Sequence, residues 1–103
     1  VRIGVCITDS HGRAWRNGTV GITIGLSGIP GIVDLRGEQD IFGYTLRATI
    51  IAAADSLAAG AALIMGETSE MTPVVHVRGF PYPFRDDVGL QELIRDPEQD
   101  LFR

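Results

Sequence analysis

The sequence predicts an α+β fold, in which an antiparallel or mixed sheet of four to five strands carries one long, Ala-rich helix. Apolar runs of strand length occur at residues 1–7, 19–29 and 46–51, whereas only residues 52–65 are rich in alanine, the strongest helix former. Because the first strands follow one another without a helical crossover, a doubly wound parallel sheet is not expected. One helix leaves one sheet face to be covered by a dimer partner, an absent segment of the same protein, or both.

The first strand and the segment after it form the most polar part of the prediction. Residues Val1–Ile7 are apolar and rich in β-branched side chains, and the run ends near Asp9, as a buried strand would end. We expect Thr8–Gly18 to be a loop, because loops beyond rigid strands often carry functional groups. This loop combines a carboxylate, hydroxyl groups, an imidazole and two guanidinium groups, a mixture that suits a metal-bound phosphate.

The second strand, Thr19–Ile29, has a period of two. Its larger apolar residues alternate with small ones, the pattern of a strand with one buried face. Gly21, Gly25 and Gly28 fall on the other face, where a helix or another backbone could approach closely. A dinucleotide-binding interpretation of these glycines fits poorly, because that fingerprint needs its glycines in a turn between strand and helix.

One helix is predicted over Ala52–Met65, with Gly66 well placed as its C-cap. Asp55 lies near its start, where the helix dipole favours a negative charge, and this structural role is at least as good an explanation as a catalytic one. The remaining predicted elements are a short strand at Ile32–Leu35, a loop at Arg36–Tyr44, a strand at Leu46–Ile51, a polar loop at Glu67–Thr72 and a strand at Pro73–Val77. Residues 1–80 then form one unit, and the Pro-rich, charged residues 81–103 form a tail or linker.

Composition excludes several functions. The chain has 103 residues and a net charge of −4, which argues against a nucleic-acid partner. All nine basic residues are arginine, so the chain itself supplies no phosphate-loop or Schiff-base lysine. Cys6 is the only cysteine and lies within an apolar run, as a buried structural thiol does. The absence of a signal peptide and of an apolar run of about 18 residues predicts a cytoplasmic protein with no membrane partner.

Several motifs occur in one order over residues 1–80. They are Val5–Gly18, with the core Ile-Thr-Asp-Ser-His-Gly-Arg-Ala-Trp-Arg-Asn-Gly; the glycine-spaced Gly21–Gly28; Asp34–Gly43, reading Asp-Leu-Arg-Gly-Glu-Gln-Asp-Ile-Phe-Gly; Leu46–Thr49; Ala53–Asp55 with the helix behind it; Met65–Glu67; and Val74–Gly79. Together they resemble the C-terminal half of the ligase domain in the coenzyme F-420-0 γ-glutamyl ligase family. The tail from Glu92 to Arg103 resembles, less distinctively, the stretch before a fused nitroreductase-like domain in two-domain members.

The resemblance implies an enzyme, a ligase that uses GTP to add L-glutamate to the carboxylate of coenzyme F-420-0 through an acyl phosphate. The uncovered sheet face predicts a homodimer. The family's metal ligands fall on Asp9, Ser10 and Glu67, all hard oxygen donors suited to Mg²⁺ or Mn²⁺. K⁺ is a further expected ion. As an alternative that needs no metal, Asp9 could simply cap a turn.

The resemblance also places a nucleotide contact after the helix. The family's guanine-nucleotide region matches Met65, Gly66, Glu67, Thr68, Ser69, Glu70, Met71 and Thr72. To these we add Arg13 and Arg16 as candidate phosphate clamps, because guanidinium groups bind phosphate oxygens well; Arg16 could equally pair with a surface carboxylate. No catalytic residue is assigned.

The sequence departs from the family in ways that leave alternatives open. The half that precedes the Asp9 loop in the family, with a further metal-binding Asp, is missing, and Ser56 stands where Glu is common. We therefore expect the isolated chain not to turn over alone. One alternative is a non-catalytic dimerisation or binding module. Another is an unrelated metal-dependent phosphate-handling enzyme that shares only the Asp9 loop.

Overall fold

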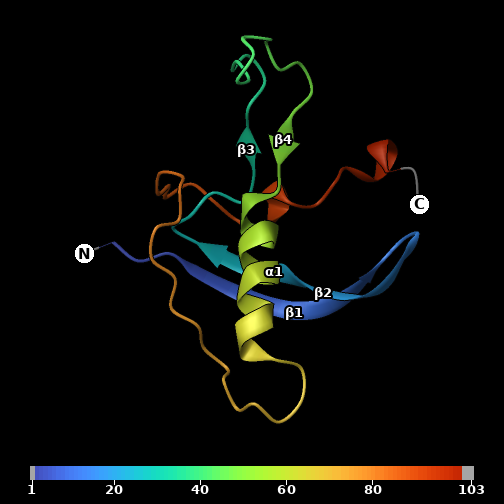
Figure 1. Cartoon of the computed structure of the whole chain (residues 1–103), viewed down its shortest axis with the longest axis vertical. Helices are drawn as coiled ribbons and strands as arrows, with labels where there is room; N and C mark the ends of the chain where they lie inside the picture. Colours follow the sequence, from blue (N-terminus) through green and yellow to red (C-terminus); the bar gives the residue numbers. More distant parts are fainter. Residues whose placement is uncertain (1, 101–103) are drawn as a thin grey trace.

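The computed structural model describes residues 2–100 and has an α+β architecture of one helix and two small antiparallel sheets (Figure 1). Its elements are β1 (Val5–Arg13), β2 (Arg16–Ser27), β3 (Val33–Asp34), β4 (Ile50–Ile51), α1 (Ala53–Met65) and two short 3₁₀ helices, η1 (Leu90–Glu92) and η2 (Pro97–Gln99). β1 pairs with β2 and β3 with β4, each as a separate two-stranded sheet. The predicted single sheet of four to five strands is therefore not confirmed.

The hairpin of β1 and β2 corrects the first predicted loop. Val1 lies outside the described residues, and the strand begins at Val5 and continues to Arg13. Most of Thr8–Gly18 is thus strand, turning at Trp15, which has a positive φ of 65°. The prediction was wrong because polar residues were taken to end the strand. The far part of the hairpin is exposed on both faces, so polar side chains there cost no burial energy, while β2 supplies the backbone partners.

The helix packs on the face of the hairpin that carries the small residues. A Cβ on Gly21 would lie 2.6 Å from the backbone oxygen of Ala58 and 2.9 Å from Cβ of Ala62. The predicted close approach of a helix at Gly21 is therefore confirmed. The apolar positions of β2 are not the buried face that the alternation suggested, since Ile24 is 48% exposed.

The helix itself agrees with its predicted position and is shorter than foreseen. It begins at Ala53, spans 13 residues and ends at Gly66, whose φ of 73° and N–H bond to the oxygen of Ala62 confirm the C-cap. Thirteen residues is close to the mean helix length, so the helix is not long. No helix among residues 2–100 is long and apolar enough to span a membrane.

β3 and β4 form the base of an arm that projects from the molecule (Figure 1). The predicted strand Leu46–Ile51 shrinks to its last two residues, because local bonds organise the arm instead. The carboxylate of Asp40 accepts bonds from the N–H groups of Phe42 and Tyr44 at 2.8 and 3.0 Å. Lower on the arm, bonds from Arg36 hold the pKa of Asp34 at about 2.

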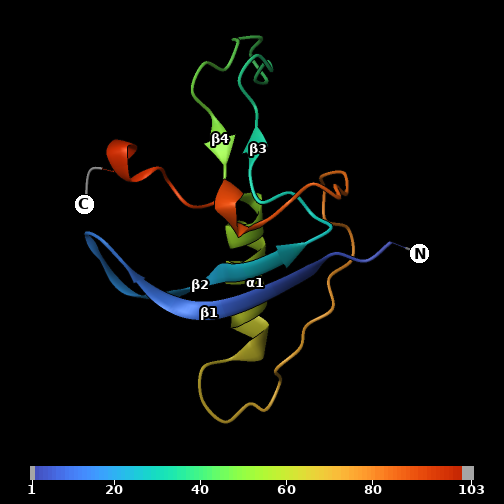
Figure 2. The same ribbon diagram turned by 180° about the vertical axis from the view of Figure 1, so that it is seen from behind.

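No strand forms at Pro73–Val77, contrary to prediction. Val74 is 80% exposed, so the segment gains little from burial. The residues that follow this segment pack against the end of β2. The N–H of Arg85 donates to the oxygen of Gly28 at 3.0 Å, and Arg85 pairs with Glu92 at 3.2 Å. Figures 1 and 2 both show this tail passing the start of α1 and the end of β2.

The core is small. Its buried apolar residues are Ile29 and the alanines at 53, 54 and 58 of α1, and no large side chain of residues 2–100 is fully buried. In Figure 2 the hairpin lies in front of α1 with its other face toward the viewer. That face leaves Val5 and Ile7 more than half exposed. As expected, residues 2–100 leave one face of this hairpin without a cover.

Candidate functional site

A cleft of about 140 Å³ lies between the hairpin and the C-terminal end of α1. Its walls come from β1, β2, α1 and the residue pair after the helix. The lining residues are Thr8, Asp9, Ser10, Gly21, Ala62, Met65, Gly66 and Glu67. All three residues predicted as metal ligands are among them, so the fold brings together positions that lie 57 residues apart in sequence.

Ser10 and Glu67 contact each other directly. The hydroxyl of Ser10 donates to the two carboxylate oxygens of Glu67 at 2.7 and 2.6 Å. Ser10 turns to the helix side because Gly21, its partner on β2, is the residue on which α1 rests. Gly66 ends the helix with a positive φ and so directs Glu67 back toward β1.

Asp9 also lines the cleft, beside Ser10 on β1. Its Oδ1 accepts a bond from the N–H of Ser10 at 2.9 Å. Among the lining residues, Asp9, Ser10 and Glu67 carry two carboxylates and one hydroxyl, the hard donors that Mg²⁺ and Mn²⁺ prefer. Residues 2–100 contain no group of three His, Cys, Asp or Glu side chains that could hold a metal. The donor set fits such an ion but covers only part of its coordination.

The loop after the helix folds onto itself. Glu70 accepts bonds from the backbone N–H of Thr68 at 2.9 Å and from its hydroxyl at 3.1 Å, and these bonds lower the pKa of the Glu70 carboxyl. The Glu70 side chain fills the space beside Gly66 that a Cβ would need. Met71 has a positive φ of 58° and is 91% exposed. The two donors of Thr68 are therefore arranged to hold an anionic oxygen.

Arg13 and Arg16 lie elsewhere. They face each other at the last paired position of the hairpin, outside the lining of the cleft. The guanidinium of Arg13 donates to the backbone oxygen of Asn17 at 3.1 Å. Both are exposed, and neither contributes to the cleft as it stands.

A polar contact between helix and hairpin was not foreseen from the sequence. The carboxylate of Asp55 accepts a bond from the N–H of Thr23 at 2.9 Å, and the hydroxyl of Thr23 lies 3.2 Å from the sulfur of Cys6. The helix-dipole explanation of Asp55 named no partner. The only signal in the sequence was an acidic residue in a helix whose inner face is otherwise alanine.

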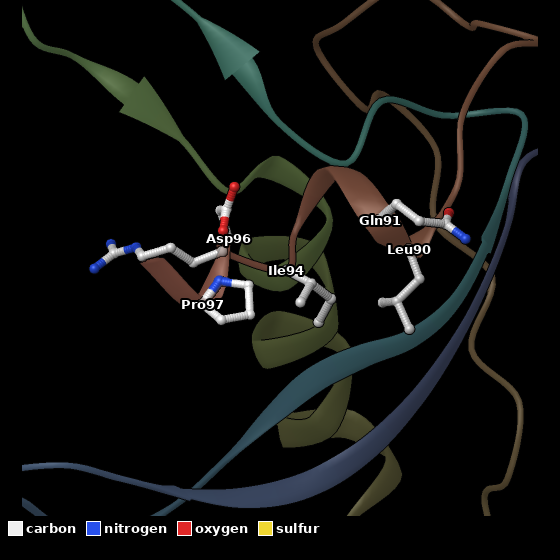
Figure 3. Close-up of a pocket in the computed structure, with 6 residues that line it drawn as sticks. Leu90, Gln91, Ile94, Asp96 and Pro97 are labelled. Carbon is white, nitrogen blue, oxygen red and sulfur yellow. The ribbon is translucent and has the colours of Figure 1, made fainter. Parts of the chain in front are cut away.

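A second hollow, of about 390 Å³, lies in the tail (Figure 3). Leu90, Ile94 and Pro97 give it an apolar surface, and Arg95 and Asp96 lie at its side. It shares no lining residue with the cleft at Ser10 and Glu67.

Comparison with known proteins decides the family. The model of the F420-0:gamma-glutamyl ligase family matches residues 1–79. The chain belongs to this family. The match extends far beyond the Asp9 segment, so an unrelated enzyme that shares only this segment is excluded. The resemblance inferred from the motifs is confirmed.

Members of the F420-0:gamma-glutamyl ligase family include curated relatives named coenzyme F420:L-glutamate ligase. The protein of Methanocaldococcus jannaschii is 50% identical over 102 residues, and that of Methanococcus maripaludis strain C7 is 48% identical over 101 residues. That of Halobacterium salinarum is 43% identical over 101 residues. These alignments cover 98–99% of this chain and 39–41% of each relative. The chain thus spans about two fifths of the length of these relatives.

Proposed function

We propose that the chain is part of a cytoplasmic enzyme that adds L-glutamate to coenzyme F-420-0, with GTP as co-substrate. The observation that carries this proposal is the contact of Ser10 with Glu67 in a cleft that Asp9 also lines. Family membership and the name shared by the relatives support the reaction class.

The proposed reaction has two steps. A carboxylate oxygen of coenzyme F-420-0 forms a bond to the γ-phosphorus of GTP, and GDP leaves. The amine of L-glutamate then attacks the acyl carbon of the resulting acyl phosphate, inorganic phosphate leaves, and the nitrogen loses a proton. A bound Mg²⁺ or Mn²⁺ would neutralise phosphate charge as the anionic reactants approach. K⁺ is proposed as a further ion.

Within this chain, Asp9, Ser10 and Glu67 would hold the divalent ion. The donors of Thr68 would meet a phosphate oxygen in place of Glu70, within the proposed nucleotide region Met65–Thr72. We keep Arg13 and Arg16 as proposed phosphate clamps, with the condition that the end of the hairpin moves toward the nucleotide, because they lie outside the cleft. Two carboxylates are a small set for this ion, which supports the proposal that the isolated chain does not turn over.

A non-catalytic dimerisation module is the second candidate. The half-exposed apolar side chains on the outer face of the hairpin favour it. The same face supports a homodimer under the ligase proposal, so dimerisation alone does not separate the two candidates. Metal and nucleotide binding separate them.

The first experiment is Mn²⁺ binding to this chain, followed by electron paramagnetic resonance with and without GTP. The ligase proposal predicts saturable binding that GTP tightens. Asp9→Asn and Glu67→Gln should each weaken it about tenfold or more, because each removes a charged oxygen donor. Glu38→Gln is the matched control, since Glu38 is exposed on the arm and its bonds to other residues among 2–100 come from its backbone; it should bind as the unmodified chain does.

The second experiment uses a longer protein, in which this chain is joined to the remaining part of a full-length ligase. Mn²⁺ titration is repeated, and glutamate addition to coenzyme F-420-0 is followed by mass spectrometry with GTP. Product formation that Glu67→Gln abolishes would support the ligase. If Mn²⁺ still fails to bind, the ligase proposal is wrong and the non-catalytic module is favoured.

A further inference from the structure

We propose that Asp55 is a positioning residue for the Ser10–Glu67 cleft. Its carboxylate fixes the first turn of α1 to the hairpin, so that the other end of the helix delivers Glu67 to Ser10. The inference rests on the proposed function in one respect only, namely that this cleft binds a divalent cation.

The contact made by Asp55 is placed to act as an anchor. Its Oδ1 accepts from the backbone N–H of Thr23, a residue that is only 4% exposed. A hydrogen bond from a buried donor to a charged acceptor is among the stronger ones in proteins. Because the donor belongs to the backbone of β2, the bond ties the helix to the strand itself rather than to a mobile side chain.

The anchor coincides with an irregularity in the hairpin. Ile7 pairs with Gly25 and Thr8 with Thr23, so Ile24 is left without a partner in a β-bulge. A bulge changes which side chains face each side of a strand, and a slip of one residue would turn Ser10 away from the helix. Asp55 binds the residue next to this bulge.

Three contacts then follow one another along α1. Asp55 meets Thr23, the backbone at Ala58 lies against Gly21, and Glu67 meets Ser10. At 1.5 Å per residue the helix carries the chain about 15 Å from Asp55 to its last residue. Loss of the anchor would let α1 rotate on Gly21, and that rotation would separate Glu67 from Ser10.

The test compares Asp55→Ala with Asp55→Asn by Mn²⁺ titration and electron paramagnetic resonance. Asparagine keeps the oxygen that accepts from Thr23 and loses the charge. We expect Asp55→Ala to weaken Mn²⁺ binding about 10- to 100-fold, as loss of a supporting bond does at metal sites, and Asp55→Asn to bind almost as the unmodified chain. Ser56→Ala, one residue along and exposed, is the control and should change nothing.

Several outcomes would overturn the proposal. If Asp55→Asn weakens binding as much as Asp9→Asn does, Asp55 acts through its charge and not as an anchor. If a folded Asp55→Ala binds Mn²⁺ normally, the anchor is not needed. If Asp55→Ala does not fold, amide hydrogen exchange decides: the Thr23 amide should be protected in both the unmodified chain and Asp55→Asn, and fast exchange in the unmodified chain would refute the bond.

A measurement without metal tests the positioning role of Asp55 separately from the proposed ligase function. The carboxyl ¹³C resonance of Glu67 should move in Asp55→Ala to the position it has in Ser10→Ala, because both changes remove the contact between Ser10 and Glu67. An unmoved resonance would refute positioning by Asp55. Failure of the unmodified chain to bind Mn²⁺, with this resonance moving as expected, would count against the metal site and leave the anchor in place.

Discussion

Cys6 shows how the contact between helix and hairpin acts on a single side chain. Burial raises the pKa of its thiol, the nearby charge of Asp55 raises it further, and the hydrogen bond with Thr23 lowers it in part. The folded chain therefore prefers the neutral thiol. The stabilisation that this preference provides is present below the usual cysteine pKa of about 8.5 and is lost as pH rises through the higher native pKa.

We expect the Cys6 thiol to react with a disulfide reagent several-fold more slowly in the native chain than in urea at pH 8.5, because only the thiolate attacks. The pH midpoint of the native rate should lie above the usual value. Asp55→Asn should move this midpoint down, since it removes a negative charge near the sulfur. Equal native and denatured rates at this pH would contradict the assignment.

At the level of residues, resemblance predicted more than pattern did. Asp9, Ser10 and Glu67 were named together only because motifs on both sides of the cleft matched a family, and the structure places them around one cleft. Nothing in the local sequence joins Ser10 to Glu67. The contact of Asp55 was not predicted from the sequence, because its carboxylate accepts from a backbone N–H. Every residue type except proline offers that donor.

Among the elements, the packing of α1 on β2 depends on one missing side chain. Gly21 lies so close to the backbone of Ala58 that no Cβ fits without moving the helix. At Gly12, farther along the same hairpin, a Cβ would have no described residue within 4 Å apart from its two chain neighbours. The two glycines therefore form a matched pair for mutation.

Gly21→Ala should lower the free energy of unfolding by about 1–3 kcal/mol, because the added methyl meets backbone that cannot yield. Gly12→Ala should be neutral or slightly stabilising, since it restricts only the unfolded chain. Urea denaturation followed by circular dichroism measures both. Similar midpoints for the two variants would show that α1 does not rest on Gly21 as described.

The predicted elements succeeded where local signals suffice. Alanine content and Gly66 located the helix within one residue at its start, because helix bonds are local. The strand predictions were wrong where the presence of a pairing partner determines whether a segment forms a strand. β1 extends through polar residues because β2 lies beside it, whereas Pro73–Val77 has β-branched valines and forms no strand. Pairing partners cannot be read from a segment alone.

As a whole, the molecule is more open than its length requires. Its radius of gyration is 15.2 Å, compared with about 13 Å for a typical domain of 100 residues. Large apolar side chains are exposed on several parts of the molecule, including the hairpin and the arm. On these two parts they include Val5, Ile7, Ile24, Trp15, Ile41, Phe42 and Tyr44. Such surface is typical of an interface.

We therefore expect the chain to associate at micromolar concentration. Ile7→Glu and Ile24→Glu should each shift sedimentation toward the monomer, because they place a charge among the exposed apolar residues of the hairpin. Ser56→Glu adds the same charge on the exposed side of α1 and should leave association unchanged. A monomer for the unmodified chain would refute the expectation.

The cleft between β1 and Glu67 also has a consequence for thermodynamic linkage. Its two walls belong to a hairpin and to the end of a helix, which meet only when the chain is folded. A ligand that needs both Ser10 and Glu67 cannot bind the unfolded chain and must raise its melting temperature. Above the dissociation constant, each tenfold increase in free ligand adds about 1.4 kcal/mol to the free energy of unfolding. Because the core is small, a ligand bound in this cleft also helps to hold the fold together.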